Sequence, residues 1–393
     1  MNEYGHRLDG IKVARISTVA FFVETQLRSQ ILDIAHAGAE VTVVASEAAL
    51  ECEIPGVRYV SIDIPRKIKI LRDFSALLRL WLFFRRSDFD IVHSTTPKAG
   101  LLCSLAARLA GVPVRLHTFT GQPWVGLTGI KRFLSKTSDK LIVRLNTHCY
   151  ADSGSQKEFI VKSGVARQEQ VSVLGSGSLA GINLERFNPR RFSEGDNNSL
   201  RTELGIASCT SVLLFVGRIS RDKGLAELLA AFQKIIAGGG DRVLILLGPS
   251  ETDIESVLSK LEYKVRQKII MPGFSSEPER FMAIADILLL PSYREGFGTV
   301  VVEAAAMGLP AIGTDIYGLS DAIVAGETGL LVPVKCADEL AIAINKLLGD
   351  PILRRGMSCK ARDRVVREFS SQRVSGLVID DYVDFLRANK RLQ

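Results

Sequence analysis

The sequence predicts an α/β protein of two Rossmann-like domains, each a doubly wound parallel sheet, that face a cleft. Its 393 residues exceed the roughly 150 of a common single domain. In both halves, short and nearly continuous apolar runs alternate with longer segments of helical period, which is typical of parallel sheets covered on both faces. The polar segment 189–199 separates the two series and suggests a linker. We therefore expect an N-terminal domain over residues 1–190 and a C-terminal domain over residues 191–370.

The apolar runs qualify as strands because each is short, rich in aliphatic residues and bounded by glycine, proline or polar residues. The first half holds runs at 12–17, 40–46, 57–63, 90–96, 114–120, 147–153 and 171–177. The second half holds runs at 211–217, 242–248, 268–273, 287–292, 310–315 and 329–333. Ligands of open parallel sheets bind beyond the carboxyl ends of the strands, so the residues that follow each strand are the first candidates for a site.

Composition excludes several classes of protein. Apolar residues make up 47% of the chain, too many for intrinsic disorder, and the longest apolar stretch (76–84) is far shorter than the ~20 residues that span a bilayer. The six cysteines are widely separated, which argues against a metal site or a disulfide framework. The first residues contain no apolar signal region, so we expect a cytoplasmic protein.

The excess of basic charge lies in the first half. Residues 1–190 hold 25 basic and 17 acidic side chains, whereas residues 191–393 hold 25 and 26. This asymmetry indicates an anionic partner of the first domain, such as a membrane surface, nucleic acid or a phosphorylated substrate. No recognisable nucleic-acid-binding motif is present, so we expect no nucleic-acid partner.

The segment 291–310 (PSYREGFGTVVVEAAAMGLP) follows an apolar strand and combines a glycine-bearing loop with a helix. Gly296 and Gly298 let the backbone approach a ligand closely, and free amides at the start of the helix suit a phosphate. Glu295 lies in the loop. Glu303 lies more than one turn inside the helix, where a carboxylate is costly to bury unless it is hydrogen-bonded. The alternative for Glu303 is a structural role, as a cap of a neighbouring loop.

The segment 217–224 (GRISRDKG) directly follows the first strand of the second domain. It brings Arg218 and Lys223 to the carboxyl end of that strand, where two cations can clamp an anionic group. The alternative is a pair of solvated surface cations.

Together these segments resemble those of the retaining, nucleotide-sugar-dependent glycosyltransferases of family 4, which have the GT-B architecture of two Rossmann-like domains. The resemblance rests on two glutamates eight residues apart (Glu295, Glu303), on the GR-x-x-x-x-KG loop and on GLPAIGTD…GETGLLVP within 308–333. It covers nearly all of the second domain and, more weakly, the first. Such architectures often return the last helix, here within 371–393, to the first domain.

The resemblance implies a role for each matching residue. Arg218 and Lys223 match the pair that binds the leaving diphosphate, and Glu295 matches the residue that contacts the donor sugar, so these three form the catalytic set. Glu303 matches the residue that holds the ribose hydroxyls. The amides of one loop are implied to meet the phosphates: those of Gly296, Phe297, Gly298 and Thr299. Fixed cations and amides at a departing diphosphate lower the barrier, so no metal ion or other cofactor is expected.

The first domain departs from the family pattern. Many relatives have a glycine-rich loop after the first strand, whereas residues 17–22 (STVAFF) contain no glycine. Many also have a His-Gly pair after the fifth strand, where this chain has Thr120 and Gly121. His117 could replace that histidine or could be an ordinary core residue, because strand alternation points it to the face opposite Thr120. His117, Thr120 and Gly121 are the acceptor-side candidates.

A basic and apolar segment of the first domain predicts a membrane contact. Residues 65–86 (PRKIKILRDFSALLRLWLFFRR) intersperse bulky apolar residues with cations, as in helices that lie on anionic lipid. A second basic stretch covers 131–140. The alternative is a packed helix whose cations are solvated. The residues expected to touch the membrane are Lys67, Lys69, Trp81, Phe83 and Phe84.

The sequence thus predicts a glycosyltransferase at the inner face of the cell membrane. We expect it to move a sugar from a nucleotide sugar, by preference a UDP-sugar, to a polyprenyl-diphosphate-linked saccharide in surface polysaccharide synthesis. Two alternatives remain open. One is a soluble enzyme of the same fold that acts on a small molecule or a sugar phosphate, and the other is a non-catalytic protein that binds nucleotide sugars.

Overall fold

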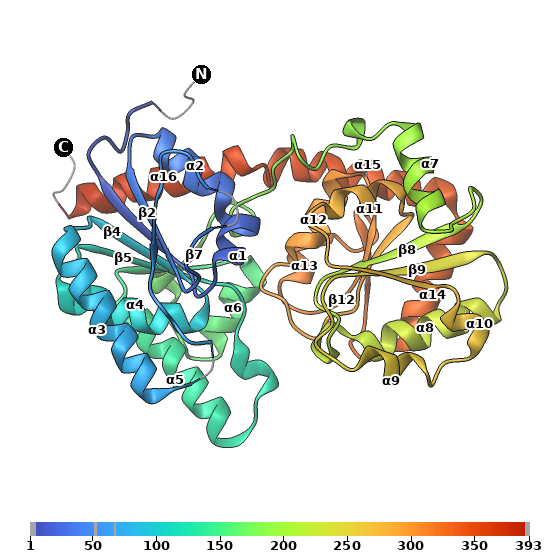
Figure 1. Ribbon diagram of the computed structural model, residues 1–393, viewed down its shortest axis with the longest axis horizontal. Coiled ribbons are helices and arrows are strands. Elements are labelled where there is room, and N and C mark those ends of the chain that lie inside the picture. Colours follow the sequence, from blue (N-terminus) through green and yellow to red (C-terminus); the bar gives the residue numbers. More distant parts are fainter. Residues whose placement is uncertain (1–4, 51–52, 67, 390–393) are drawn as a thin grey trace. The chain divides into compact units, whose positions relative to one another are not determined.

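The computed structural model describes residues 5–50, 53–66 and 68–389. The chain forms two compact units (Figure 1). The first unit comprises the residues up to Gly181 together with those from Ser370 onward, and the second unit is Ile182–Phe369. Each unit surrounds one parallel sheet with helices, so the predicted fold class of two Rossmann-like domains is confirmed.

The first unit is built on a seven-stranded parallel sheet in the order β3-β2-β1-β4-β5-β6-β7. Its register sets Val13 of β1 opposite Val41 of β2 on one side and Ile91 of β4 on the other. Every apolar run expected to be a strand in this half forms one. The strands are β1 (Lys12–Ile16), β2 (Glu40–Ala45), β3 (Arg58–Ser61), β4 (Ile91–Thr95), β5 (Val114–Phe119), β6 (His148–Ala151) and β7 (Val171–Val173).

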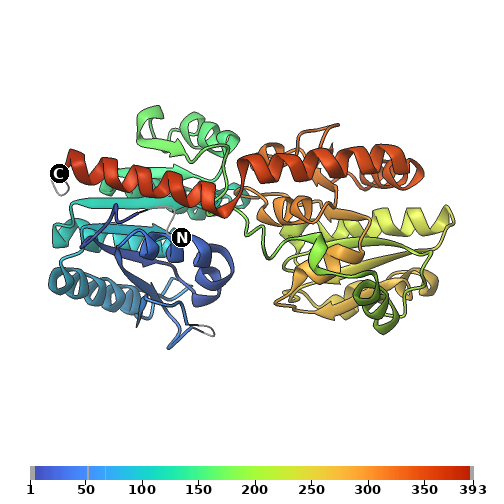
Figure 2. The ribbon, with the colours of Figure 1, turned by 90° about the horizontal axis from the view of Figure 1, so that it is seen from above.

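Helices cover both faces of this sheet. Successive side chains of a strand point to opposite faces, and in these strands the side chains on both faces are apolar. Val13 packs in a core beneath α2 and α16, and the next residue, Ala14, packs in a core beneath α3 and α4. Figure 2 shows α16 running along the sheet. The helices are α1 (Ala20–Phe22), α2 (Arg28–His36), α3 (Ile70–Ser87), α4 (Pro97–Ala110), α5 (Gly129–Leu145), α6 (Gly154–Lys162) and α16 (Ser371–Ala388), with shorter turns η1 (Val23–Leu27), η2 (Pro123–Gly126) and η3 (Gln168–Gln170).

The second unit is built on a six-stranded parallel sheet in the order β10-β9-β8-β11-β12-β13. All the expected strands are again present. The central strand β11 is Ile-Leu-Leu-Leu and is buried along its whole length, as in sheets covered on both faces. The strands are β8 (Ser211–Val216), β9 (Arg242–Leu247), β10 (Ile269–Gly273), β11 (Ile287–Leu290), β12 (Ala311–Thr314) and β13 (Gly329–Val332).

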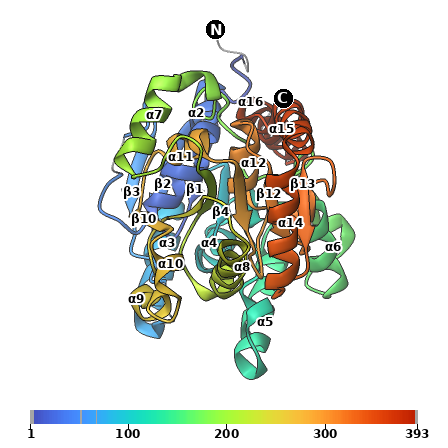
Figure 3. The same ribbon diagram turned by 90° about the vertical axis from the view of Figure 1, so that its right-hand side faces the viewer.

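Helices also cover both faces of the second sheet. α8 and α14 pack side by side, and α12 packs against α15 (Figure 3). The helices are α7 (Glu194–Glu203), α8 (Leu225–Ala237), α9 (Ile254–Leu258), α10 (Tyr263–Arg266), α11 (Pro278–Ile284), α12 (Thr299–Ala306), α13 (Leu319–Ala322), α14 (Ala337–Gly349) and α15 (Pro351–Glu368), with turns η4 (Pro189–Arg191) and η5 (Arg221–Lys223).

The polar segment 189–199 is not a linker, and this expectation was wrong. It contains η4 and the first turns of α7, a helix that begins with a capping box between Ser193 and Asp196. The chain enters the second unit earlier, at Ile182, because the side chains of Ile182 and Phe187 pack in the core of that unit. A polar composition fits an exposed helix as well as it fits a linker.

The order of the strands reverses once in each sheet, between β1 and β4 in the first and between β8 and β11 in the second. At such a switch point the connections leave toward opposite faces and open a crevice at the carboxyl ends of the strands. In the second unit the two loops that flank this point are 217–224, after β8, and 291–298, after β11. Within the described ranges, no helix has the length and apolar character needed to cross a bilayer.

Candidate functional site

The two loops at the switch point of the second sheet pack tightly against each other. Gly224 has φ +72°, and a Cβ atom on it would lie 2.0 Å from the carbonyl oxygen of Pro291. The amide of Tyr293 donates to the carbonyl oxygen of Asp222 at 2.9 Å. A glycine is therefore required at 224, because any side chain would push the two loops apart.

This packing brings two of the predicted catalytic residues into direct contact. Nζ of Lys223 donates to Oε1 of Glu295 at 2.5 Å. The hydroxyl of Ser292 donates to the same carboxylate oxygen at 2.7 Å. The side chains of Lys223 and Glu295 are only 17% and 14% exposed, so water screens this ion pair less than a surface pair. The result is a fixed cation beside a fixed hydrogen-bond acceptor.

The other predicted clamp residue, Arg218, lies on the same loop and is also paired. Its Nη1 donates to Oε2 of Glu251 at 2.6 Å, and its Nη2 lies 3.5 Å from Oδ2 of Asp222. The hydrogen bond to Glu251 raises the pKa of Arg218, with further contributions from Asp222 and Glu295. Almost half of the Arg218 side chain is exposed, so it is open to an incoming anion.

The loop 295–298 leads into α12 and leaves the start of that helix open. Gly298, the N-cap, has φ +79°, and no side chain among the described residues caps the helix. The amide of Val301 donates to the carbonyl of Gly298 at 2.8 Å, which leaves the amides before it for an anion, as the positive end of a helix dipole favours. Gly318 packs closely against this loop, and a Cβ atom on it would lie 2.6 Å from the carbonyl oxygen of Gly296. Thr299 is half-buried at the first helical position.

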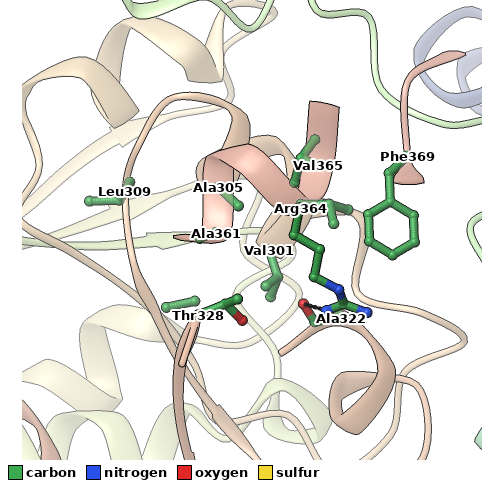
Figure 4. A pocket seen from close by; sticks show the side chains of 11 residues that line it. Val301, Ala305, Leu309, Ala322, Thr328, Ala361, Arg364, Val365 and Phe369 are labelled. Atoms are coloured by element: carbon green, nitrogen blue, oxygen red, sulfur yellow. Dashed lines mark hydrogen bonds between the residues drawn. The ribbon is translucent and has the colours of Figure 1, made fainter. Parts of the chain in front are cut away.

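Phe297 holds this loop to the core of the second unit. Its buried ring packs 5.2 Å from the ring of Phe369, and the guanidinium of Arg364 lies 5.0 Å from the centre of that second ring. Figure 4 shows Arg364 beside Phe369, with its guanidinium directed at the carbonyl of Ala322, to which it donates at 3.1 Å. Phe297 can thus offer a ligand its backbone but not its side chain. The small cavity in this view lies between α12 and α15 and contains no clamp residue.

Glu303 lies in α12, and its carboxylate is unpaired. Among the described residues, no group forms a hydrogen bond or an ion pair with it, so the structural alternative of a loop cap does not hold. Burial raises the pKa of Glu303 to about 7, the Arg186 guanidinium opposes this rise, and the carboxylate of Glu279 adds to it. Arg186 itself is occupied, because its Nε donates to Oε1 of Glu279 at 2.9 Å. Glu303 is therefore a hydrogen-bonding group for which the described part of the chain supplies no partner.

The second unit thus places two cations (Lys223, Arg218), two carboxylates (Glu295, Glu303) and the open start of α12 on the loops 217–224 and 291–298 and the helix that follows. Within the part of the chain that the structure describes, no three His, Cys, Asp or Glu side chains come together as metal ligands would. The chemistry that these groups offer is the binding of an anion and of hydroxyl groups.

In the first unit, His117 does not belong to a site. It lies inside β5, is 1% exposed, and its Nδ1 lies 3.0 Å from the hydroxyl of Ser94. The centre of its ring lies 4.7 Å from that of Phe119 in a T-shaped arrangement. The ring also fills the space beside Gly100, where a Cβ atom would lie 2.4 Å from Cε1 of His117. Burial lowers the pKa of His117 to about 3. The acceptor-side prediction for His117 is therefore wrong, since it is a core histidine.

Thr120 and Gly121 directly follow β5, at the carboxyl edge of the first sheet. Thr120 is half-buried, and Gly121 has φ +109°, a conformation that favours glycine. Their role on the acceptor side stays a prediction.

Sequence reasoning missed a buried polar group close to these residues. Asp152 follows β6 and is 5% exposed, and its Oδ1 has no hydrogen-bond partner among the described residues. Burial raises its pKa to about 8. Gln122 is fully buried, its Oε1 accepts from Nε2 of Gln156 at 3.3 Å, and its own Nε2 is unpaired within the same described ranges. A signal was present in the sequence, because Asp152 stands at the end of the apolar run 147–153, where residues that follow a strand are site candidates.

Of the residues predicted to touch the membrane, Phe84 is buried, and for this residue the prediction was wrong. Phe84 is 2% exposed, and Trp81 and Phe83 are half-buried against the core beneath α3. Lys69 is exposed, and Lys67 lies outside the described residues. The apolar side chains that α3 and its preceding turn do expose are Ile68, Ile70, Leu71, Phe74, Leu78 and Leu82.

Helix α5, like α3, exposes large apolar side chains. Its apolar Ile130, Phe133 and Leu134 are 75%, 67% and 59% exposed. The cations Lys131 and Arg132 lie between them and are exposed too. Both helices pack against α4, so they belong to one face of the first sheet.

Comparison with known proteins gives matches along both units. Residues 23–177 match the glycosyl transferase 4-like domain, and residues 196–364 match the family described as glycosyl transferases group 1. The capsular polysaccharide biosynthesis glycosyltransferase CapM of Staphylococcus aureus is 32% identical over 84% of this chain and 86% of its own length.

Two further relatives carry names that specify an acceptor. The UDP-Gal:alpha-D-GlcNAc-diphosphoundecaprenol alpha-1,3-galactosyltransferase of Escherichia coli is 26% identical over 82% of each chain. The D-inositol 3-phosphate glycosyltransferase of Rhodococcus opacus (strain B4) is 27% identical over 75% of this chain and 67% of its own.

Solved structures share the fold. Sucrose-phosphate synthase of Thermosynechococcus elongatus superimposes with a TM-score of 0.81 over 96% of this chain and 100% of its own, at 21% identity. Anabaena Alr3699/HepE, solved with UDP and glucose, superimposes with a TM-score of 0.76 over 94% of this chain and 99% of its own, at 18% identity. Since CapM matches most of both chains and both units match in order along the chain, the protein belongs to family 4 of the GT-B glycosyltransferases.

Proposed function

We propose that the enzyme transfers a sugar, with retention of configuration, from a UDP-sugar to a polyprenyl-diphosphate-linked saccharide in the synthesis of a surface polysaccharide. The observation that carries the donor half of this proposal is the contact between Lys223 and Glu295 beside the open start of α12. A cation and free amides bind phosphate, while a carboxylate binds sugar hydroxyls. The UDP in the HepE structure supports the choice of nucleotide.

Each residue of this site would act on a different part of the donor. Lys223 and Arg218 would take up the negative charge that develops on the diphosphate as the bond to the sugar breaks, which lowers the barrier. The amides of Gly298 and Thr299 would add to this stabilisation. Glu295 would orient the sugar. The unpaired carboxylate of Glu303 would accept hydrogen bonds from the ribose hydroxyls. We propose that no metal ion is needed, because fixed cations already meet the leaving group.

The acceptor half of the proposal rests on the first unit. Thr120 and Gly121 would line the acceptor site, at the carboxyl edge of a sheet whose unit carries the basic excess of the chain. The Escherichia coli relative is named for a diphosphoundecaprenol acceptor and CapM for capsular polysaccharide, and both names support a lipid-linked saccharide.

Such an acceptor requires contact with a membrane, and we propose that α3 and α5 provide it at the inner face of the cell membrane. Leu71 and Phe74 of α3 are 87% and 66% exposed, and Phe133 of α5 is 67% exposed. Exposed cations flank them. Apolar side chains that enter the interface and cations that attract anionic headgroups are the two parts of an interfacial helix.

A second candidate keeps the donor site and changes the acceptor to a soluble sugar phosphate. The relative named for D-inositol 3-phosphate favours it, since that acceptor is small and anionic. The exposed apolar residues of α3 and α5 argue for the lipid-linked acceptor instead, because a soluble substrate gives them no role.

The test is transfer of labelled sugar from a panel of UDP-sugars to short-chain polyprenyl-diphosphate saccharides and to sugar phosphates, with and without a chelator. We expect transfer from one UDP-sugar to a lipid-linked acceptor, unchanged by the chelator. Transfer only to sugar phosphates would support the second candidate. Loss of transfer with the chelator would contradict metal independence, and inversion of the anomeric configuration by NMR would contradict retention.

A further inference from the structure

One carboxylate outside the motif residues holds the clamp arginine. Glu251 accepts the 2.6 Å hydrogen bond from Nη1 of Arg218 and lies on the loop after β9, a strand adjacent to β8. The second carboxylate near Arg218, Asp222, is farther away at 3.5 Å and is shared with Arg294 at 3.6 Å. Glu251 is therefore the principal partner of Arg218.

The backbone fixes this partner in place. Gly248 has φ +140°, and a Cβ atom on it would lie 2.0 Å from the carbonyl oxygen of Gly217, so two glycines let the ends of β8 and β9 approach closely. Beyond them the amide of Ile219 donates to the carbonyl of Pro249 at 2.9 Å, and the amide of Glu251 donates to the carbonyl of Ile219 at 3.1 Å. Backbone hydrogen bonds between the two loops thus keep the main chain of Glu251 close to that of Arg218.

We infer that Glu251 is a tethered competitor of the donor diphosphate for Arg218. In the free enzyme it neutralises the guanidinium. A bound diphosphate displaces it, and it pairs with Arg218 again as the nucleoside diphosphate leaves. The inference rests on the proposed function, because it requires Arg218 to bind the diphosphate.

Electrostatics sets the direction of the effect. The donors of a guanidinium lie in one plane, and a carboxylate that accepts from Nη1 competes for them with a phosphate, which is also negatively charged. Glu251 also repels the diphosphate at short range. It therefore weakens donor and product binding and favours release of the product. Arg218 and Glu251 are 45% and 48% exposed, so solvent screens the pair and the effect is modest.

The test is the affinity of purified full-length protein for UDP, ADP and GDP by calorimetry, in the wild type and in Glu251→Gln. The amide cannot neutralise Arg218, so we expect the nucleotide that the wild type binds to bind about 2- to 5-fold more tightly in the variant. The inhibition constant of that nucleotide as a product should fall by the same factor. Glu255→Gln is the matched control, since Glu255 is exposed on α9 nearby and contacts no arginine among the described residues.

Equal or weaker binding by a folded Glu251→Gln variant would overturn the inference, because Glu251 would then be neutral or would position Arg218 for the phosphate. Equal gains in Glu251→Gln and Glu255→Gln would overturn it as well, by reducing the effect to net charge. Failure of the wild type to bind any of the three nucleotides would instead overturn the proposed function and remove the basis of the inference.

Discussion

The two sheets share an architecture but differ in the chemistry at their carboxyl edges. In the second unit the groups at the edge are charged and paired, with Lys223 held by Glu295. In the first unit, the side chains that follow β5 and β6 include the hydroxyl of Thr120 and the carboxyl of Asp152, whose pKa burial raises to about 8. Under the proposed function, the edge of the second unit would bind the donor diphosphate and the edge of the first unit would meet the acceptor saccharide. The two sheets would then serve different ligands through the loops that follow their strands.

The strongest test of the charged edge is Lys223→Ala. Removal of the cation leaves the charge on the departing diphosphate unstabilised, so we expect turnover to fall by about two orders of magnitude. Initial rates with a verified donor measure this. Lys260→Ala, an exposed lysine of the same unit, is the control and should leave the rate unchanged. Wild-type turnover in Lys223→Ala would remove the proposed role of this edge.

The contact between the two donor loops is tested by Gly224→Ala. The new methyl group would meet the carbonyl of Pro291, so we expect the free energy of unfolding of the second unit to fall by about 2–4 kcal/mol. Gly239→Ala is the control, because Gly239 has a similar φ of +82° but open space around it, and it should cost about 1 kcal/mol. Urea denaturation compares the two. Equal losses would mean that the loops do not need this close approach.

The surface of the first unit is tested by Leu71→Ser combined with Phe74→Ser. The removed side chains are exposed, so we expect unchanged stability and about 10-fold weaker binding to anionic vesicles in a flotation assay. The control is Ile342→Ser combined with Ile352→Ser, two exposed apolar residues of the second unit. If the control pair weakened vesicle binding as much, the membrane contact would not be specific to the first unit.

The burial of Asp152 at the edge of the first sheet is tested by the pH dependence of stability. The pKa of Asp152 is about 8 in the folded protein and about 4 when unfolded, so ionisation costs stability as pH rises from about 4 to about 8. Asp152→Asn has no such ionisation. We expect the advantage of this variant over wild type in free energy of unfolding to be several kcal/mol larger at pH 8.5 than at about pH 4, since each pKa unit between about 4 and about 8 corresponds to about 1.4 kcal/mol. Parallel stability profiles of the two proteins would contradict this prediction, because they would mean that folding leaves the pKa of Asp152 unchanged.

The charged site could be predicted because it depends on local sequence and sheet topology. Parallel strands bring their carboxyl ends to one edge, so the loops that carry Lys223 and Glu295 had to lie close together. Each loop is short and tied to its strand. The same reasoning predicted every strand that the structure contains among the described residues.

The errors concern features that packing decides. Helix α3 has many apolar residues, and its packing against the sheet, Phe89 and α4 determines that Phe84 is buried while Leu71 is exposed. The burial of His117 likewise depends on Gly100 of α4, which no local pattern links to it. The helical start at Ser193 could have been recognised from its capping box with Asp196.

The placement of α16 has a consequence for the synthesis of the protein. Tyr382 accepts a hydrogen bond from the buried Arg15 at 2.9 Å, and Val378 and Leu386 fill the core beneath the first sheet. The first unit to be translated is therefore the last to be completed. The second unit can close as soon as Phe369 has left the ribosome, while the nascent first unit keeps an open apolar face until α16 emerges.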